Sequence, residues 1–259
     1  MKNLILCFSA TGNSYYIAKK IADRTDDCEI KMINEITEEN FATPERLGII
    51  FPIHASMEPY PVDNFITEIL GKADDKTNLK YVYAISNASV NFSFWGIKRC
   101  EMLLKREGIT LTYANHVKMP SNYFVKESKD SDKKNIEIIE KSNVKIDKII
   151  EDVESEKFKF PAWKPKLIGA LNHTVYLSMI HSYGANYHVS DKCIDCGLCY
   201  RDCPTNNITM VNHKPEFANK CIACAACINN CPANAIYLKK ENPTQYRNPL
   251  IKFSHKYRD

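Results

Sequence analysis

The residues best suited to chemistry are eight of the chain's eleven cysteines, which form two runs with the same spacing. The first run comprises Cys193, Cys196, Cys199 and Cys203. The second run comprises Cys221, Cys224, Cys227 and Cys231. Each run reads C-x2-C-x2-C-x3-C-P, and each cysteine of the second run lies 28 residues after its counterpart. This agreement indicates an internal repeat of one metal-binding unit.

The spacing of the cysteines is that of ligands for iron–sulfur clusters. Three thiolates at intervals of three residues can surround one cluster from a tight loop, and the fourth, followed by proline, ligates the cluster of the other run. We therefore expect a first 4Fe–4S cluster on Cys193, Cys196, Cys199 and Cys231. We expect a second 4Fe–4S cluster on Cys221, Cys224, Cys227 and Cys203.

Two other uses of cysteine fit this pattern less well. Zinc is satisfied by four ligands, usually in two pairs, and does not require two triplets. Disulfides are typical of small exported scaffolds, whereas this chain enters a strand-like run directly after Met1 without a signal peptide. Residues 167–190 are too polar for a membrane span, so we expect no transmembrane segment and a cytoplasmic location.

From about residue 188 to 240 the chain resembles bacterial-type ferredoxins with two clusters. The resemblance implies a small α+β domain that carries electrons, but it does not say between which molecules. Isoleucines that recur in the repeat are expected to keep water away from the clusters: Ile194, Ile208, Ile222 and Ile236.

The formal charge of +4 counts the cysteines as neutral thiols. Eight thiolate ligands would remove eight charges and iron would restore only part of them, so the metal-loaded protein is near neutral or acidic. Such a balance gives little support to nucleic-acid binding. We expect instead a redox protein or a small-molecule acceptor as the partner, and the oligomeric state stays open.

The N-terminal part of the chain has the pattern of an anion-binding site. Residues 4–8 form a short apolar run typical of a buried parallel strand, and residues 15–24 have helical spacing. A polar loop between a strand and a helix N-terminus can bind a phosphate through its N–H groups. Neither G-x-G-x-x-G nor G-x4-G-K-[ST] is present, which argues against dinucleotide and ATPase loops. The loop residues are Ser9, Ala10, Thr11, Gly12, Asn13 and Ser14.

Strand-like and helix-like segments then alternate along the chain. Further strands are expected at residues 28–33, 47–53, 79–86 and 109–117. Further helices are expected at residues 61–70, 93–107 and 132–156. Five strands with interleaved helices predict an α/β fold with a doubly wound, five-stranded parallel sheet. In such a fold the ligand lies at the carboxyl ends of the strands.

The S-x-T-G-N-S loop resembles the FMN-phosphate loop of flavodoxins. The loops at residues 52–60 and 86–95 resemble, by position, the two flavodoxin loops that enclose the isoalloxazine ring. The resemblance implies FMN, with backbone amides at the ring edge and aromatic or Met side chains at its faces. The ring-binding candidates are Pro52, Ile53, His54, Ala55, Ser86, Asn87, Ala88, Asn91, Phe92 and Trp95. A Met-Pro-x-Asn-Tyr segment after the last strand adds Asn122 and Tyr123.

The order of these features resembles the flavodoxin–ferredoxin fusion proteins of anaerobic bacteria over nearly the whole chain. We expect a flavodoxin-like FMN domain at residues 1–158 and a linker with an interdomain helix at 159–187. The two-cluster ferredoxin domain is expected at residues 188–240. The polar tail, residues 241–259, is expected either to lack fixed structure or to lie over a domain.

The expected function is electron transfer between FMN and the two clusters, and on to or from a redox partner. The alternative is a flavin-dependent reductase of a small organic acceptor, fed by the clusters. A reductase would need a proton donor near the flavin. The candidates are His54, His116 and Tyr123.

Overall fold

The structure, a computed structural model, describes residues 2–54, 57–73, 75–90, 95–122, 132–160, 184–238 and 244–251. Its contacts divide the chain into two compact units. The first unit comprises Met1–Ser9, Asn13–Pro120 and Ile136–Gly169. The second unit comprises Ala10–Gly12, Ser121–Asn135 and Ala170–Asp259, so three residues of the polar loop count with it.

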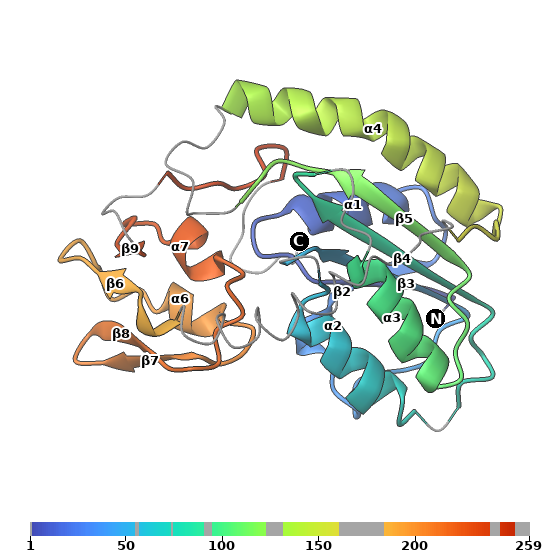
Figure 1. Ribbon diagram of the computed structural model, residues 1–259, viewed down its shortest axis with the longest axis horizontal. Helices are drawn as coiled ribbons and strands as arrows, with labels where there is room; N and C mark the ends of the chain where they lie inside the picture. Colours follow the sequence, from blue (N-terminus) through green and yellow to red (C-terminus); the bar gives the residue numbers. More distant parts are fainter. Residues whose placement is uncertain are drawn as a thin grey trace. The chain divides into compact units, whose positions relative to one another are not determined.

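The first unit contains the expected five-stranded parallel sheet (Figure 1). Its strands are β1 (Asn3–Cys7), β2 (Cys28–Met32), β3 (Arg46–Pro52), β4 (Tyr81–Ala88) and β5 (Tyr113–Lys118). The strand order is β2-β1-β3-β4-β5, which is the flavodoxin-like form of the doubly wound fold. The predicted fold class is therefore confirmed.

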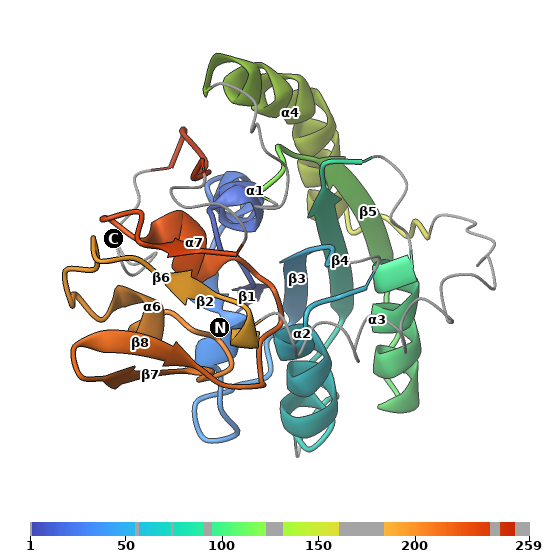
Figure 2. The ribbon, with the colours of Figure 1, turned by 60° about the vertical axis from the view of Figure 1, so that its left-hand side comes forward.

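Helices cover both faces of this sheet. They are α1 (Asn13–Ala22), α2 (Tyr60–Asn64), its π-helical continuation η2 (Phe65–Leu70), α3 (Trp95–Arg106) and α4 (Asp132–Glu154). Figures 1 and 2 show α1 and α4 on one face and α2 and α3 on the other. The central strands β1 and β3 are consequently buried on both sides, which explains why their sequences are continuously apolar instead of alternating.

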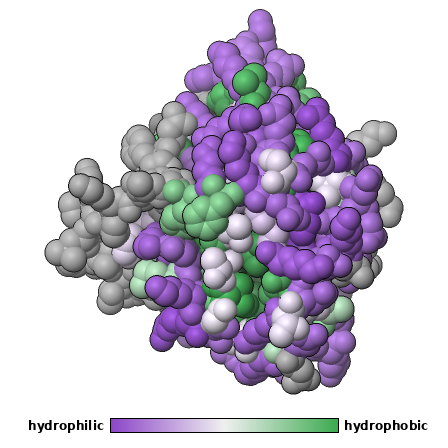
Figure 3. All heavy atoms as spheres, turned by 90° about the vertical axis from the view of Figure 1, so that its right-hand side faces the viewer, coloured by the Kyte–Doolittle hydropathy of each residue, from purple (hydrophilic) through white to green (hydrophobic). Residues whose placement is uncertain are grey.

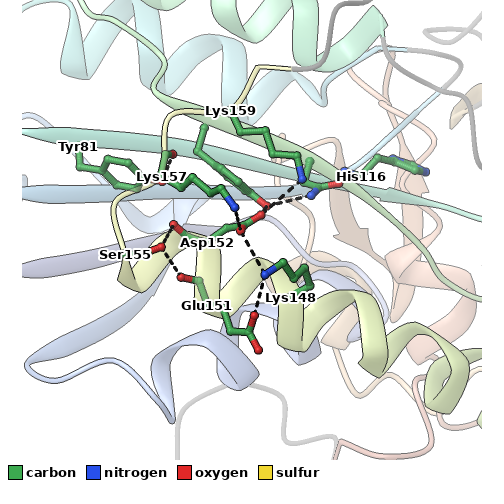
Figure 4. A network of polar contacts seen from close by, with 10 residues as sticks. Tyr81, His116, Lys148, Glu151, Asp152, Ser155, Lys157 and Lys159 are labelled. Atoms are coloured by element: carbon green, nitrogen blue, oxygen red, sulfur yellow. Dashed lines mark hydrogen bonds and ion pairs between the residues drawn. The ribbon is translucent and has the colours of Figure 1, made fainter.

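Asp152, near the C-terminal end of α4, ties that helix to the edge of the sheet (Figure 4). Its side chain is 1% exposed and accepts hydrogen bonds from the Tyr113 hydroxyl at 3.2 Å and from Lys157 at 3.0 Å. Lys159 contacts the same carboxylate at 3.4 Å and Lys148 at 3.7 Å. Burial raises the pKa of Asp152, but the hydrogen bonds and lysine charges outweigh it and hold the pKa below its usual range.

Replacing Asp152 with alanine should lower the free energy of unfolding by about 2 kcal/mol, because three lysines lose their buried counter-charge. That figure is below the usual cost of breaking a buried pair because the lysines are half exposed. Since folding lowers the pKa of Asp152, its contribution is present at neutral pH and disappears as the pH falls below about 4. Urea unfolding at pH 7 and pH 3 measures both effects. Glu151→Ala, one residue away and 67% exposed, is the control and should change little.

Among the described residues of the second unit, two small antiparallel sheets and two short helices surround the cysteine repeat. Strand β6 (His188–Val189) pairs with β9 (Ile236–Tyr237), and β7 (Ile208–Val211) pairs with β8 (Lys214–Phe217). The helices are α6 (Leu198–Arg201) and α7 (Ala226–Asn230). Tyr187, Ala225, Ile228 and Ile236 form a small hydrophobic core.

The sequence repeat extends to the backbone conformation. Residues in the left-handed region recur 28 positions apart: Asp195 with Ala223, Gly197 with Ala225, and Asn206 with Asn234. Their φ angles agree closely, at 55° and 49°, 67° and 60°, and 49° and 48°. The two cysteine loops therefore follow the same path, as two copies of one metal-binding loop would.

The side of the molecule drawn in Figure 3 is mainly hydrophilic, with only small hydrophobic areas among the residues coloured there. Within the part of the chain that the structure describes, no helix is both long and apolar enough to cross a membrane. Of the linker and interdomain helix expected at residues 159–187, residues 161–183 lie outside the described residues.

Candidate cofactor sites

Cysteines from both runs line one pocket in the second unit. They are Cys203, Cys221, Cys224 and Cys227. The pocket holds about 330 Å³ of empty space, part of it open to solvent. Its wall includes Tyr187, Ile208, Phe217 and Ile222. The four cysteines are the ones expected to ligate the second cluster, with the fourth cysteine of the first run facing three cysteines of the second.

Backbone amides approach the cysteine sulfurs at matching positions of the repeat. The N–H of Asn207 lies 3.3 Å from Cys203 Sγ, and the N–H of Ala235 lies 3.3 Å from Cys231 Sγ. In both cases the donor is four residues after the cysteine. Hydrogen bonds of this kind stabilise thiolates and tune the potential of a bound iron–sulfur cluster. The fourth cysteine of each run thus has a backbone hydrogen-bond donor beside its sulfur.

The pocket disfavours uncoordinated thiolates. Burial raises the pKa of Cys224 to about 12 and raises that of Cys227 well above its ordinary value, with neighbouring cysteine charges adding to the rise. Coordination to a metal removes the proton and compensates this cost. No three His, Cys, Asp or Glu side chains of the described residues converge on a position for a single metal ion. The four cysteines line the sides of a shared space, which suits a cluster bound at its corners.

The remaining cysteines are related electrostatically. Burial raises the pKa of Cys199 to about 11, the amide of Tyr200 lowers it, and charges on Cys231, Cys196 and Cys193 raise it further. Among these neighbours Cys231 belongs to the other run. Cys199 thus interacts electrostatically with the three other cysteines expected at the first cluster.

One expectation about the repeat is wrong. Ile208, Ile222 and Ile236 are buried, but Ile194 is 64% exposed and does not keep water away from a cluster. The repeat gives both loops the same backbone path, whereas the residues that cover each loop come from outside the repeated cysteines. Tyr187 lines the pocket beside Ile222.

The polar loop between β1 and α1 has the geometry of an anion site. Gly12 adopts φ 95°, a conformation that glycine reaches at little cost. The loop leads directly into α1, whose first N–H groups have no partner within the helix and whose dipole favours negative charge. Thr11 and Ser14 are only 2% and 1% exposed, so their hydroxyls lie within the loop and away from bulk water.

Each of these two hydroxyls accepts a hydrogen bond from an asparagine. In the first unit, Asn87 Nδ2 donates to Ser14 Oγ at 2.7 Å. In the second unit, Asn122 Nδ2 donates to Thr11 Oγ1 at 3.2 Å. Because the amide uses a lone pair of the hydroxyl oxygen, the hydroxyl proton is directed elsewhere and can be donated to an anion. Asn87 and Asn122, expected to touch the flavin, here orient the loop hydroxyls.

The loop after β3 holds two buried polar atoms without a hydrogen-bond partner among the described residues. They are Nδ1 of His54 and Oε2 of Glu58. Burial lowers the pKa of His54 to about 4, so its imidazole is neutral at physiological pH. Burial raises the pKa of Glu58 to about 7 although Arg99 offsets part of the rise, with its Nε 2.6 Å from Glu58 Oε1. Unpaired polar atoms beside apolar side chains suit the polar edge of a flavin ring.

Sequence reasoning passed over Glu58 and Arg99. An acidic residue in the middle of an otherwise apolar loop was the available signal, but its partner is 41 residues away. Gly96 in α3 fits closely against this loop, since a Cβ there would lie 2.9 Å from the amide nitrogen of Glu58. The start of α3 therefore positions the loop.

His116 contacts Ser86 in β4 and Val90 in the loop after β4 through its two ring nitrogens. Its Nδ1 lies 2.8 Å from Ser86 Oγ and its Nε2 lies 2.7 Å from the carbonyl oxygen of Val90. Burial lowers the pKa of His116, so the ring is neutral and both of its nitrogens have partners. This arrangement suits a positioning residue better than a proton donor.

The other ring-binding candidates divide into two groups. Pro52 pairs in register with Asn87, Ile53 donates its N–H to Asn87 at 2.8 Å, and Ala88 and Trp95 lie at the end of β4 and the start of α3. These residues therefore meet at the carboxyl ends of neighbouring strands. The second group, outside the described residues, is Ala55, Asn91, Phe92 and Tyr123.

Comparison with known proteins bears directly on the cysteine repeat. Residues 192–236 match the family model of a 4Fe-4S dicluster domain. That segment contains all eight cysteines of the two runs. No curated protein is significantly similar to the chain in sequence.

Solved structures with a similar arrangement include a Trp repressor binding protein from Bacillus subtilis, with 17% identity, coverage of 46% of this chain and 84% of that one, and a TM-score of 0.37. An archaeal flavodoxin has 14% identity, coverage of 58% and 99%, and a TM-score of 0.39. A flavone reductase has 13% identity, coverage of 89% and 88%, and a TM-score of 0.39. Because these TM-scores are low, the fold assignment rests on the strand order of the sheet and not on the similarity to these structures.

Proposed function

We propose that the chain is an electron-transfer protein that binds FMN in its N-terminal domain and two 4Fe–4S clusters in its cysteine repeat. The observation that carries the proposal is the pocket that gathers cysteines of both runs. The dicluster-domain match over residues 192–236 supports the same chemistry. When bound, FMN would exchange electrons in pairs or singly and each cluster would carry one electron at a time.

The proposed cluster ligands follow the cross-ligation pattern. Cys193, Cys196, Cys199 and Cys231 would hold one cluster. Cys221, Cys224, Cys227 and Cys203 would hold the other, in the pocket described above. The N–H groups of Asn207 and Ala235 would stabilise the thiolate of the cross-ligating cysteine at each cluster.

In the FMN site, the hydroxyls of Thr11 and Ser14 and the amides at the start of α1 would bind the phosphate. Nδ1 of His54 and Oε2 of Glu58, which have no hydrogen-bond partner among the described residues, would meet polar atoms of the ring. The proposed domains are residues 1–158 for FMN, 188–240 for the clusters, and the linker and tail at 159–187 and 241–259. The resemblance to flavodoxin–ferredoxin fusion proteins supports this division.

Reduction of a small organic acceptor is the second candidate function. It requires an acid near the flavin, and His54 and Glu58 are described residues beside the proposed ring site that could supply a proton. The lowered pKa of His54 leaves little of the protonated form at neutral pH, and His116 has partners at both nitrogens. Burial raises the pKa of Glu58 to about 7, so Glu58 is the acid that a reductase would use. The pocket that gathers cysteines of both runs favours electron transfer.

Anaerobic reconstitution should yield about eight irons and about one FMN per chain. About four irons, bound zinc, or no FMN would each contradict the proposed cofactors. Photochemically reduced protein should then pass electrons to dyes and to low-potential redox proteins, because no proton transfer to the acceptor is needed. Turnover of a small organic acceptor that is lost in a Glu58→Gln variant with unchanged FMN and iron content would instead establish the reductase.

A further inference from the structure

Residues 244–251, here called the C-terminal strap, belong to the polar tail that was expected either to lack fixed structure or to lie over a domain. Tyr246 and Asn248 are each only 2% exposed. A polar segment loses conformational entropy when it is fixed in one place, so it needs specific partners. The strap belongs to the second unit.

The strap is attached to the second cysteine run. Gln245 donates its side-chain amide to the carbonyl oxygen of Cys231 at 2.7 Å. The N–H of Tyr246 donates to Asn229 Oδ1 at 2.9 Å, and Arg247 Nε donates to the carbonyl oxygen of Asn229 at 2.9 Å. Asn229 is completely buried. These bonds fix the strap along the end of α7.

Asn230 and Asn248 contact Ala10, Thr11 and Gly12, the residues of the polar loop that belong to the same unit. The N–H of Asn248 donates to the carbonyl oxygen of Thr11 at 2.8 Å. Asn230 Nδ2 donates to the carbonyl oxygen of Ala10 at 3.1 Å. Gly12 is in close contact with the strap, because a Cβ on it would lie 3.0 Å from Asn248 Cβ.

These two bonds determine where the next amides point. A peptide unit is planar and trans, so its C=O and the N–H of the following residue point in opposite directions. Holding the carbonyl of Ala10 therefore orients the N–H of Thr11, and holding the carbonyl of Thr11 orients the N–H of Gly12. Both N–H groups therefore point away from Asn230 and Asn248.

We propose that the C-terminal strap, through Asn248, and Asn230 beside Cys231 are positioning elements of the FMN-phosphate site. They hold the two peptide units that join Ala10 to Thr11 and Thr11 to Gly12 in one orientation before the phosphate binds. The inference rests on the proposed FMN site. It places residues more than two hundred positions from the loop among those that determine flavin affinity.

Asn248→Pro in the full-length reconstituted protein removes the N–H that binds the Thr11 carbonyl. The dissociation constant for FMN should rise about tenfold, as expected for a lost hydrogen bond that positions a charged ligand, while the iron content stays unchanged. Asn230→Ala, which leaves the strap intact, should also raise the dissociation constant for FMN. Leu250→Ala is the matched control in the strap, since this side chain is 44% exposed, and should change the constant by less than about twofold.

Hydrogen exchange at the amides of Thr11 and Gly12 in FMN-free protein gives a readout that does not depend on flavin. Both amides should exchange faster in Asn248→Pro and Asn230→Ala than in Leu250→Ala. Unchanged exchange would contradict the hold on the loop, and faster exchange with an unchanged FMN constant would contradict its role in the flavin site. A wild-type protein that binds no FMN would instead overturn the proposed function itself.

Discussion

Replacing Cys203 with serine should empty the cluster site of the second cysteine run, although Cys203 belongs to the first. The iron content should fall from about eight to about four per chain, because a 4Fe–4S cluster that loses one of four thiolates is expected to be lost on purification. The physical reason is that Cys203 lines one pocket with Cys221, Cys224 and Cys227. Cys231→Ser should likewise remove the cluster of the first run, and the iron content should again fall to about four per chain.

Pairs of substitutions identify which cysteines share a cluster. Cys203→Ser combined with Cys221→Ser should retain about four irons, since both changes affect one cluster. Cys203→Ser combined with Cys193→Ser should retain almost none, since each change removes a different cluster. The opposite pattern would show that every run holds its own cluster. Cys100→Ser, a buried cysteine of α3 away from the repeat, is the control and should keep all the iron.

Removing the hydroxyls of Thr11 and Ser14 together should weaken FMN binding by about a hundredfold or more. Each hydroxyl has an asparagine amide at its oxygen and is thereby set to donate its proton to the phosphate. Two hydrogen bonds to a charged group are lost at once, and neither site offers water an easy replacement because both residues are buried. Quenching of flavin fluorescence in Thr11→Ala/Ser14→Ala measures the effect.

The iron content of this double variant should equal that of the wild type. Thr25→Ala is the control, because Thr25 lies just after the opposite end of α1 and donates its hydroxyl to the carbonyl oxygen of Ile21. It should leave the FMN dissociation constant unchanged. Wild-type affinity in the double variant would mean that the loop is not the phosphate site. Asn87→Ala, which only misdirects the Ser14 hydroxyl, should have a smaller effect than the double variant.

Asn87 and Asn122, which donate to the hydroxyls of Ser14 and Thr11, form contacts that residue spacing cannot predict. Asn87 and Asn122 were predicted to contact the flavin because they follow the carboxyl ends of strands, where a parallel sheet binds its ligand. Their contacts with Ser14 and Thr11 join residues 73 and 111 positions apart. No local pattern specifies such a pair, since it depends on how far each strand extends and on the side-chain rotamers.

His116 and Glu58 also have properties that depend on the packed structure and not on a local sequence pattern. A histidine at the end of a strand reads as a possible proton donor, but its two nitrogens are engaged by Ser86 and the Val90 carbonyl. The sequence shows Glu58 only as an acidic residue in the loop after β3, and its burial beside Arg99 arises when α3 packs against that loop. Titration behaviour depends on desolvation and on neighbouring charges, which are properties of the packed protein.

By itself, the sequence determined the order of strands and helices, the polar loop before the first helix and the two cysteine loops, because each is encoded within a few neighbouring residues. Apolar runs specify buried strands, and the C-x2-C-x2-C-x3-C spacing specifies a loop that wraps a cluster. The tertiary structure alone decided that Ile194 is exposed while Ile222 is buried. It alone decided that the C-terminal strap contacts the carbonyl of Thr11. Contacts between distant segments depend on the packing of the whole chain, and a local pattern carries no information about which of many polar segments will supply the partner.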